Sequence, residues 1–482
     1  MIGVGLDFGT SNSAAAWYDG EQVRMIPLEE CDAIMPTAMH LDRELIPLTG
    51  EAAVAQYIDE NRDRIVELTP EVIAKASMVT SEANSADPHS EAETETSSVY
   101  GQPWVDRGMP GRLFRGVKRL LGNSSIRRLL VFDHPFRLVA LITPILLRIR
   151  QAIEESLAEP LADIHFGHPV LFEGNENLRN NLAFDRLSEA CGHAGIDKLT
   201  FYPEPVAATL SYRHNDVVTA EMDNENAENT AEQSPDSGCV LTVDFGGGTL
   251  DLSVVEYSGT SFDVLSTSGI SLGGDHIDQL IFRELLFPHF GKGEIWSRVK
   301  DGRLIENDFP FEEYEDKLLN WAVTYILNQN QYRSKIIDRI AQGGQGKEKF
   351  ERLLELITHN FSYLVFQSIK DAKAALSNVE ETVIDIPELD LAVPFSRDQF
   401  EKIMTDVLGR IENVTEEVLQ RSGRGRSDID IVIRTGGSSQ IAAVKSLLEK
   451  QFPGKVTEHD PFTSVAAGLA IASYYGYQFQ RS

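Results

Sequence analysis

The chain has 482 residues, of which 42% are hydrophobic, and it carries a formal net charge of −30 at pH 7. This length indicates about three folding units, or two large lobes with insertions, and the hydrophobic fraction is sufficient for sizeable cores. The negative charge argues against binding to nucleic acid or to an anionic membrane through the overall field of the protein.

The first half of the chain begins with strands and then alternates between helix and strand. Its predicted elements are strands at 2–8, 13–18 and 23–27, mostly helix up to residue 160, a strand near 163–167, a helix around 176–193 and a strand near 199–202.

The second half opens with the same pattern of strands. Strands are predicted at 239–245, 250–257 and 261–268, followed by a helical block from Ile277 to Ser377, a strand at 429–434 and helices at 440–451 and 463–474. Within the helical block, one apolar face repeats at helical spacing and is expected to be buried: Phe350, Leu353, Leu354, Ile357, Phe361, Leu364, Val365 and Ala372. Strands that alternate with helices predict an α/β fold.

Charged residues are unevenly distributed. Met78–Ser98 and Val217–Ser237 carry acids and no Lys or Arg, which is typical of solvated surface insertions. Arg107–Arg128 carries seven basic residues and no acid. From composition alone, this basic stretch either faces phosphate groups or is a helix with one solvated face.

The cysteines and the N-terminus favour a cytoplasmic protein. Cys31, Cys191 and Cys239 match no metal-binding or CxxC spacing, so we expect small core residues in a reducing compartment. No signal peptide is visible at the N-terminus. The longest apolar run, Leu138–Leu147, is shorter than the roughly 20 residues that cross a bilayer.

One short motif occurs twice. GVGLDFGTSNSAAAWY and LTVDFGGGTLDLSVVEY each place an Asp at a strand end, then a glycine turn, a hydroxyl residue and a second strand. Such hairpins present backbone N–H groups that bind phosphate oxygens, and their acids, Asp7 and Asp244, can hold Mg²⁺ through water. Two hairpins of one design predict two lobes that face each other across a polyphosphate. No GxxxxGK[ST] or HRDLxxxN motif is present, which excludes a P-loop and a protein kinase.

These hairpins, with other segments in chain order, resemble the DnaK-type heat-shock chaperones of the actin-like ATPase superfamily. The other matching segments are RLFRGVKRLLG (112–122), YPEPVAATLSY (202–212), LGGDHID (272–278), KDAKAALS (370–377) and IRTGGSSQI (433–441). The shortened architecture is similar to the YegD-type members of that family.

The resemblance implies an α/β actin-like ATPase fold, with two lobes that each have a ribonuclease-H-like core and an outer subdomain. Lobe I would span 1–215, with its outer subdomain at about 40–130, and would be completed by 458–482. An acidic loop at 216–237 would lead to lobe II at 238–457, with an enlarged helical outer subdomain at about 275–373. The basic stretch and this helical block are candidate partner surfaces.

The resemblance also implies ATP or ADP with Mg²⁺ as ligands, and slow hydrolysis. Asp7, Asp244 and Glu204 would hold the hydrated Mg²⁺, Lys118 would neutralise the γ-phosphate, and Thr249 with Asp251 would orient the attacking water. The remaining nucleotide-binding residues would be Gly9, Thr10, Ser11, Asn12, Gly246, Gly247, Gly248, Gly273, Gly274, Lys373, Ser377, Gly436, Gly437 and Ser438.

The sequence departs from the family pattern in three places. Ala374 and Gln440 stand where the family has basic side chains that clamp adenine, which puts purine selectivity in doubt. Arg434 lies in a strand that should be buried, so it needs a partner among the phosphates or an acid across the cleft. The sequence ends without a peptide-binding domain, so we expect a chaperone-related ATPase that lacks peptide clamping. A non-hydrolysing nucleotide sensor and a small-molecule kinase of the same superfamily remain alternatives.

Overall fold

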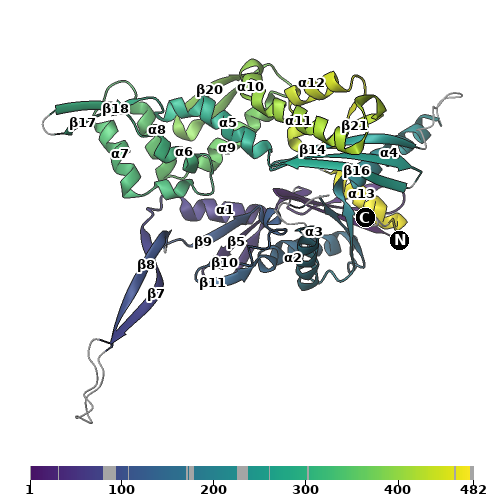
Figure 1. The fold of residues 1–482 in the computed structure, drawn as a ribbon, viewed down its shortest axis with the longest axis horizontal. Coiled ribbons are helices and arrows are strands. Elements are labelled where there is room, and N and C mark those ends of the chain that lie inside the picture. The colour runs from purple at the N-terminus through teal and green to yellow at the C-terminus, as the bar shows by residue number, and fades with distance from the viewer. Residues whose placement is uncertain are drawn as a thin grey trace, which may run out of the picture.

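The computed structural model describes residues 2–30, 32–79, 94–106, 108–169, 172, 179–224, 237–259, 261–300, 303–460 and 463–477. Its elements form two halves that lie side by side (Figure 1), with the two termini at the same end of the molecule.

The sheet of the first half combines a meander with two parallel strands. Its order is β13-β12-β1-β2-β3, and β4 pairs with β2 in addition. β1 and β2 are antiparallel, as are β2 and β3, whereas β12 and β13 run parallel to β1. The strands are β1 Gly3–Phe8, β2 Asn12–Tyr18, β3 Val23–Ile26, β4 Ile34–Pro36, β12 Ile164–His168 and β13 Leu199–Pro203.

The sheet of the second half repeats this arrangement. Its order is β16-β15-β14-β21-β22, with an antiparallel meander and two parallel strands beside the central β14. Asp7 near the end of β1 and Asp244 near the end of β14 therefore occupy matching positions. The strands are β14 Ser237–Phe245, β15 Leu250–Ser258, β16 Ser261–Ile270, β21 Ile431–Thr435 and β22 Val456–Glu458.

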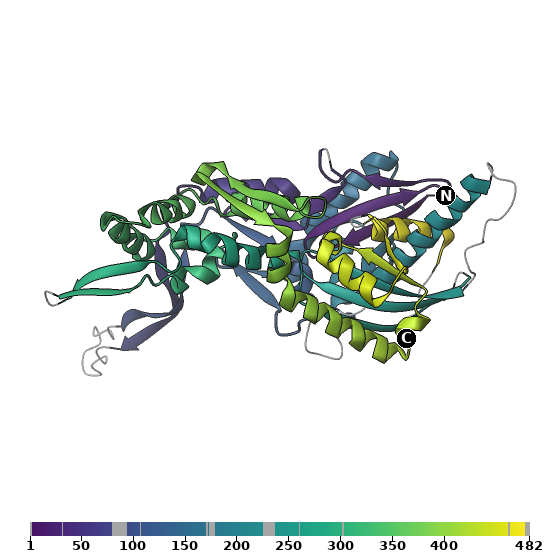
Figure 2. The same cartoon turned by 90° about the horizontal axis from the view of Figure 1, so that it is seen from above.

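Two helices, α4 (Glu204–Asn224) and α13 (Ser464–Tyr475), lie between the two sheets. Their apolar residues form one buried cluster with side chains of β2 and with Val255 of β15. Glycine permits this close packing, because a Cβ on Gly5 would lie 2.4 Å from the backbone oxygen of Ala466, and one on Gly468 would lie 1.8 Å from that of Ala207. Helix α13 thus packs against both the first sheet and α4, the helix that precedes the second half (Figure 2).

The outer part of the first half is not mainly helical, so the prediction of mostly helix up to residue 160 was wrong. The described part of this region contains only two α-helices, α1 Gly50–Asn61 and α2 Leu138–Leu157, besides the 3₁₀ turn Val117–Leu120. Strands surround them instead: β5, β6 and β9 are short, β7 pairs with β8 in a long hairpin, and β5 pairs with β9 from a distant part of the chain, which local pattern does not reveal. They are β5 Ala38–Asp42, β6 Pro47–Thr49, β7 Leu68–Val79, β8 Thr94–Asp106, β9 Gly111–Arg115, β10 Arg128–Val131 and β11 His134–Arg137. The helix α3, Arg179–His193, agrees with its prediction.

The outer part of the second half is largely helical, but a β-hairpin interrupts the predicted block. Strands β17 Ile295–Lys300 and β18 Arg303–Asp308 pair there and project from the molecule (Figure 1). The α-helices of the whole second half are α5 Gly274–Ile281, α6 Glu312–Leu318, α7 Asn330–Ala341, α8 Lys347–Thr358, α9 Ser362–Ala375, α10 Arg397–Ile403, α11 Thr405–Ser422 and α12 Ala442–Gln451, with the hairpin β19 Glu381–Ile386 and β20 Leu391–Ser396 between α9 and α10. Of the predicted apolar face, Leu354, Phe361 and Leu364 are partly buried and the other five residues are buried.

The acidic segments begin inside regular structure. Met78 and Val79 end β7, residues 94–98 begin β8, and Val217–Asn224 belong to α4, so both predicted insertions are shorter than expected; residues 80–93 and 225–236 lie outside the described residues. Cys191 and Cys239 are buried, as predicted, and burial raises the pKa of Cys239 to about 11, whereas Cys31 lies outside the described residues. Among the described helices, none is both long and apolar enough to cross a membrane.

Candidate functional site

The two glycine turns meet at the interface of the two halves. A Cβ on Gly247, in the turn between β14 and β15, would lie 3.0 Å from the Ser11 Oγ of the turn between β1 and β2. Gly9 has no room for a side chain either, because its Cβ would lie 2.2 Å from the backbone oxygen of Asn12. The two turns therefore present bare backbone to a common space.

That space is a cavity of about 170 Å³. It is lined by most of the residues that the sequence predicts to bind phosphate and metal: Asp7, Gly9, Thr10, Ser11, Asn12, Lys118, Glu204, Asp244, Gly246, Gly247, Gly248, Thr249, Asp251, Gly436 and Gly437. We call it the phosphate cleft. Residues from the two hairpins, from the 3₁₀ turn Val117–Leu120, from the start of α4 and from the end of β21 thus converge on one cavity.

Several carboxylates lie close together in the phosphate cleft. Burial, followed by the charge of Glu204, raises the pKa of Asp7 to about 7, and Lys118 only partly offsets this. The pKa of Asp244 is also raised, by burial first and then by Asp251 and Glu204. These buried acids repel one another, so the site favours an additional cation.

Lys118 is the cation that the chain itself supplies to these acids. Its side chain is buried, and its Nζ lies 2.8 Å from Oε1 of Glu204. Burial alone lowers the pKa of Lys118, but the charges of Glu204 and Asp7 outweigh it, so the pKa is raised and the ammonium stays charged. The left-handed Gly116 precedes the 3₁₀ turn and directs the lysine into the cleft.

The carboxylates suit a hydrated magnesium ion better than a directly chelated one. Asp7, Asp244 and Glu204 supply the hard oxygen ligands that Mg²⁺ prefers, and burial together with repulsion from neighbouring acids raises the pKa of both aspartates. Among the described residues, however, no three His, Cys, Asp or Glu side chains are grouped closely enough to hold a metal ion. The donor set therefore fits an ion that keeps its water shell.

Arg119 also reaches the cleft, although the sequence analysis did not include it among the site residues. A Cβ on Gly248 would lie 1.9 Å from Arg119 Nη2, so the guanidinium rests directly on the second glycine turn. Its position immediately after Lys118 in the basic stretch is the sequence feature that could have identified Arg119 as a site residue. Two members of this stretch thus line the cleft, and that they face phosphate groups stays a prediction; the alternative of one helix is wrong because the stretch forms strands and a 3₁₀ turn.

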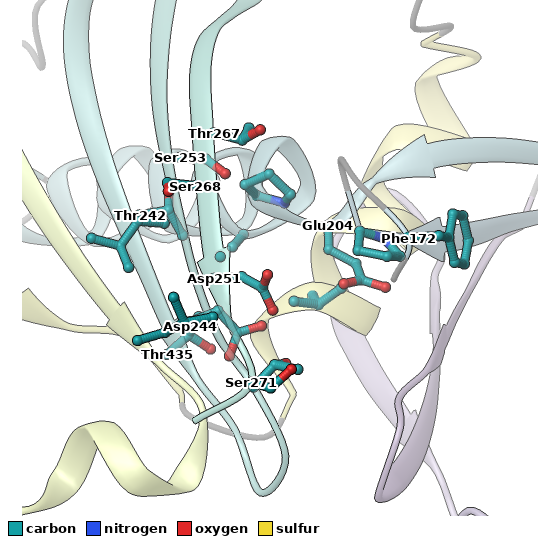
Figure 3. Close-up of a pocket in the computed structure, with 18 of the residues that line it drawn as sticks. Phe172, Glu204, Thr242, Asp244, Asp251, Ser253, Thr267, Ser268, Ser271 and Thr435 are labelled. Carbon is teal, nitrogen blue, oxygen red and sulfur yellow. The ribbon is translucent and has the colours of Figure 1, made fainter. Parts of the chain in front are cut away.

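A second cavity adjoins the phosphate cleft behind the acids. It measures about 210 Å³ and shares Glu204, Asp244, Thr249 and Asp251 with the cleft. Figure 3 shows that hydroxyl side chains of the second sheet, among them Thr242, Ser253, Thr267 and Ser268, lie along one side, with Glu204 and Phe172 on the other. We call it the hydroxyl-lined cavity.

The residues that the sequence predicts to contact the rest of the nucleotide are only partly brought together. Ser438 Oγ donates to the backbone oxygen of Gly246 at 3.0 Å, and a Cβ on Gly274 would lie 2.7 Å from the same hydroxyl. Lys373 Nζ lies 2.5 Å from Oδ1 of Asp278 and 3.4 Å from the backbone oxygen of Gly274. Gly273 packs directly on the backbone of Gly247.

The residues at the positions where the family binds the purine base do not belong to this compact group. Ser377 follows the end of α9 and lines neither cavity, and Ala374 is exposed. Gln440 Nε2 is buried, with no hydrogen-bond partner among the described residues. Within the described residues, therefore, no basic pair clamps a purine at Ala374 and Gln440.

Arg434 is buried as predicted, but it does not line the phosphate cleft, and its partners do not lie across the cleft. Its Nη1 donates to the backbone oxygen of Ser439, and its Nη2 lies 3.2 Å from Oε2 of Glu458. Glu458 faces Arg434 in the register of β21 and β22, so the ion pair lies within one sheet. The arginine anchors the loop that carries Gly436–Ser438.

Comparison with known proteins identifies the family. A family model described as Hsp70 protein matches residues 131–385 and 365–474, and the chain therefore belongs to the Hsp70 family. This family has an actin-like ATPase fold and in general binds ATP and ADP with Mg²⁺, and the mixed α/β architecture described above is consistent with it.

Curated relatives give the same assignment. Over 97% of its length the chain is 24% identical to "Chaperone protein dnaK" of Cyanidioschyzon merolae, covering 61% of that protein. It is 23% identical to proteins of the same name from Thalassiosira pseudonana and Deinococcus proteolyticus, again over 97% of this chain and over 61% and 58% of theirs. The chain thus spans about three fifths of the length of these relatives.

Proposed function

We propose that this protein is a DnaK-like ATPase that binds Mg·ATP between its two halves and hydrolyses it slowly, in a chaperone-related role. The observation that carries the proposal is the convergence of both glycine turns, Lys118 and the three carboxylates on one cavity. The matching order of the two sheets supports two lobes, one spanning 1–215 and 458–482 and the other 238–457, with outer subdomains at about 40–130 and 275–373.

The roles of the residues follow from their chemistry. The backbone N–H groups of the two turns bind phosphate oxygens, and Lys118 with Arg119 neutralises their charge. Asp7, Asp244 and Glu204 hold the water shell of Mg²⁺, which when bound supplies positive charge at the phosphates. Thr249 and Asp251 orient the water that attacks the terminal phosphate. Hydrolysis is coupled to the opening and closing of the lobes.

Lys118→Ala tests the catalytic assignment. Loss of one positioned electrostatic contact commonly lowers kcat by about 10²–10³-fold, so single-turnover ATP hydrolysis should fall by that factor. Lys445→Ala, which removes an exposed lysine on α12, is the matched control and should hydrolyse ATP at the parent rate. Turnover that is unchanged in Lys118→Ala would reject the role of this residue.

A non-hydrolysing nucleotide sensor is the first alternative, and the weakened purine end favours it. Ala374 is exposed and Gln440 is not cationic, so base recognition differs from that of the family. Single-turnover measurements with labelled ATP separate the two functions, since a sensor forms ADP no faster than buffer does. A thermal-shift series with Mg·ATP, Mg·GTP and Mg·ADP reports purine selectivity in the same preparation.

A small-molecule kinase is the second alternative, and the hydroxyl-lined cavity favours it. A ligand in this cavity would lie next to Asp251 and Thr249, beside the phosphate cleft, where polar side chains could bind a small acceptor. Transfer of labelled phosphate from ATP to a metabolite in a screen would support this function. Release of inorganic phosphate alone in every condition would leave the ATPase as the better description.

A further inference from the structure

A second basic site lies on the first half, outside the phosphate cleft. A cavity of about 510 Å³ is bounded by β10, β11, the first turn of α2 and one face of α3. Its charged side chains are those of Arg127, Arg128, Arg137, Arg186, Asp185 and Glu189. We call it the arginine pocket. In a chain with a net charge of −30, four guanidiniums in one cavity are a local exception.

The guanidiniums of the arginine pocket are not balanced by the acids around them. Arg137 forms a two-pronged ion pair with Glu189, and Arg186 donates to the backbone oxygens of Leu121, Asn123 and Ile126 at 2.8, 3.0 and 2.9 Å. Among the described residues, Arg127 and Arg128 have neither a side-chain hydrogen bond nor an ion pair. Four guanidiniums against two carboxylates leave a formal excess of two positive charges.

The fold brings the positive charges of these arginines close together, which is energetically unfavourable. Arg128 and Arg137 are direct cross-strand partners in the hairpin of β10 and β11, and like charges directly opposite each other destabilise a sheet. Burial lowers the pKa of Arg186, and the charge of Arg137 lowers it further. Arg137 is also the N-cap of the 20-residue helix α2, whose first turn contains no acid and no capping side chain. Each of these features would be relieved by a bound anion.

We propose that the arginine pocket binds a phosphate dianion, either inorganic phosphate or the phosphate group of a small monoester. A phosphate monoester carries about −1.5 to −2 charges at pH 7, which matches the excess of two. Planar guanidiniums bind its oxygens in pairs, and the uncapped N–H groups of α2 add further donors. The volume of the pocket is in the range of small-ligand sites.

The loop of residues 121–126 connects the arginine pocket with the phosphate cleft. The carbonyl groups that Arg186 holds belong to residues 121–126, directly after the 3₁₀ turn that carries Lys118. The proposal does not depend on ATP hydrolysis, because it concerns different side chains. Phosphate that binds in the phosphate cleft would do so equally in variants of the arginine pocket.

Calorimetric titration of the nucleotide-free protein with inorganic phosphate and with glycerol phosphate, at constant ionic strength, tests the proposal. Arg127→Ala/Arg128→Ala should weaken phosphate binding by about fivefold or more, because two charge-assisted contacts are lost. Arg62→Ala/Arg303→Ala, which removes two exposed arginines elsewhere, should bind like the parent protein. Glu189→Gln should tighten binding, because it raises the positive excess and frees Arg137.

Two results would overturn the proposal. Phosphate titrations of Arg127→Ala/Arg128→Ala and of Glu189→Gln that both coincide with the parent curve would show that the pocket binds no phosphate. Glutamate that binds as tightly as glycerol phosphate at the same ionic strength would show that the pocket does not select phosphate. The tighter of the two phosphate ligands identifies whether the free ion or an ester is the natural form.

Discussion

At the scale of single residues, the buried carboxylates of the phosphate cleft repel one another, and a bound cation would reduce this repulsion. Asp7 and Asp244 end the central strands of two matching sheets, so the fold itself brings their carboxylates together. Burial, and after it repulsion from neighbouring acids, raises the pKa of both. The residues proposed to hold a metal–phosphate complex thus make the ligand-free protein less stable at neutral pH.

Asp7→Asn should therefore stabilise the ligand-free protein above neutral pH. The pKa of Asp7 moves from 3.8 to about 7 on folding, so the folded protein keeps a proton that the unfolded chain has lost, and stability falls as the pH rises from about 4 to about 7. At pH 8 in EDTA the variant should gain roughly 1–3 kcal/mol, below the ~4 kcal/mol limit set by that pKa change, and at pH 4 it should match the parent.

Denaturant unfolding across this pH range measures the effect of Asp7→Asn. Asp316→Asn, which alters an exposed acid on α6, is the control and should show no pH-dependent gain. A variant that is less stable than the parent at pH 8 would mean that the attraction of Asp7 to the charge of Lys118 outweighs burial and the repulsion from Glu204.

The sequence indicates which residues lie at the cleft, but it hides other contacts for a physical reason. Asp7, Lys118, Glu204 and Asp244 lie in local motifs, and local motifs are readable. The partner of Arg434 is not readable in this way, because Glu458 becomes its neighbour only through the parallel register of β21 and β22. Arg119 was missed because its contact with Gly248 spans the two halves.

At the scale of elements, the cores of the two sheets were predictable and the outer parts were not. Long strands with clear alternation, such as β14 and β15, match their predicted ranges to within two residues. The strands β5, β6 and β9 contain three to five residues, and β5 pairs with β9 from a distant part of the chain. Segments this short carry no measurable period, so helix was the default expectation there.

The close packing of α13 on α4 yields a prediction for two glycines. Gly468→Ala should destabilise the protein by about 1–3 kcal/mol or more, because its Cβ would overlap the backbone at Ala207, which cannot move without the whole helix. Gly409→Ala on α11 should instead stabilise it by about 0.5–1 kcal/mol, because its Cβ would meet open space and alanine favours helix. Urea unfolding of both variants measures the contrast, and equal shifts would contradict the packing argument.

At the scale of the whole molecule, the two halves also meet at their outer ends, beyond the phosphate cleft (Figure 1). Val66 N donates to the backbone oxygen of Asn328 at 3.0 Å, and Asn328 Nδ2 donates to that of Arg64 at 2.9 Å. The Trp321 ring packs against Tyr57 of α1 and lies under the guanidinium of Arg115. The proposed opening of the lobes would separate this aromatic contact.

Trp321→Ala should therefore accelerate nucleotide release, on the proposal that nucleotide binds between the halves. Removing a large aromatic side chain from a buried contact commonly costs about 3–5 kcal/mol; if even a third of this acts on lobe opening, release of a fluorescent ADP should quicken about tenfold. Trp296→Ala is the matched control. Both tryptophans are buried, at 8% and 6% exposure, but Trp296 packs against Phe309 and donates to Asp338 within its own half.

Stopped-flow displacement of the fluorescent ADP distinguishes the two variants, and thermal unfolding reports the stability that each has lost. If release quickens in Trp321→Ala alone, the outer contact holds the halves together in the nucleotide-bound protein. If both variants release ADP at equal rates despite similar losses of stability, the halves open elsewhere, and the packing of α4 and α13 between the sheets then sets the rate.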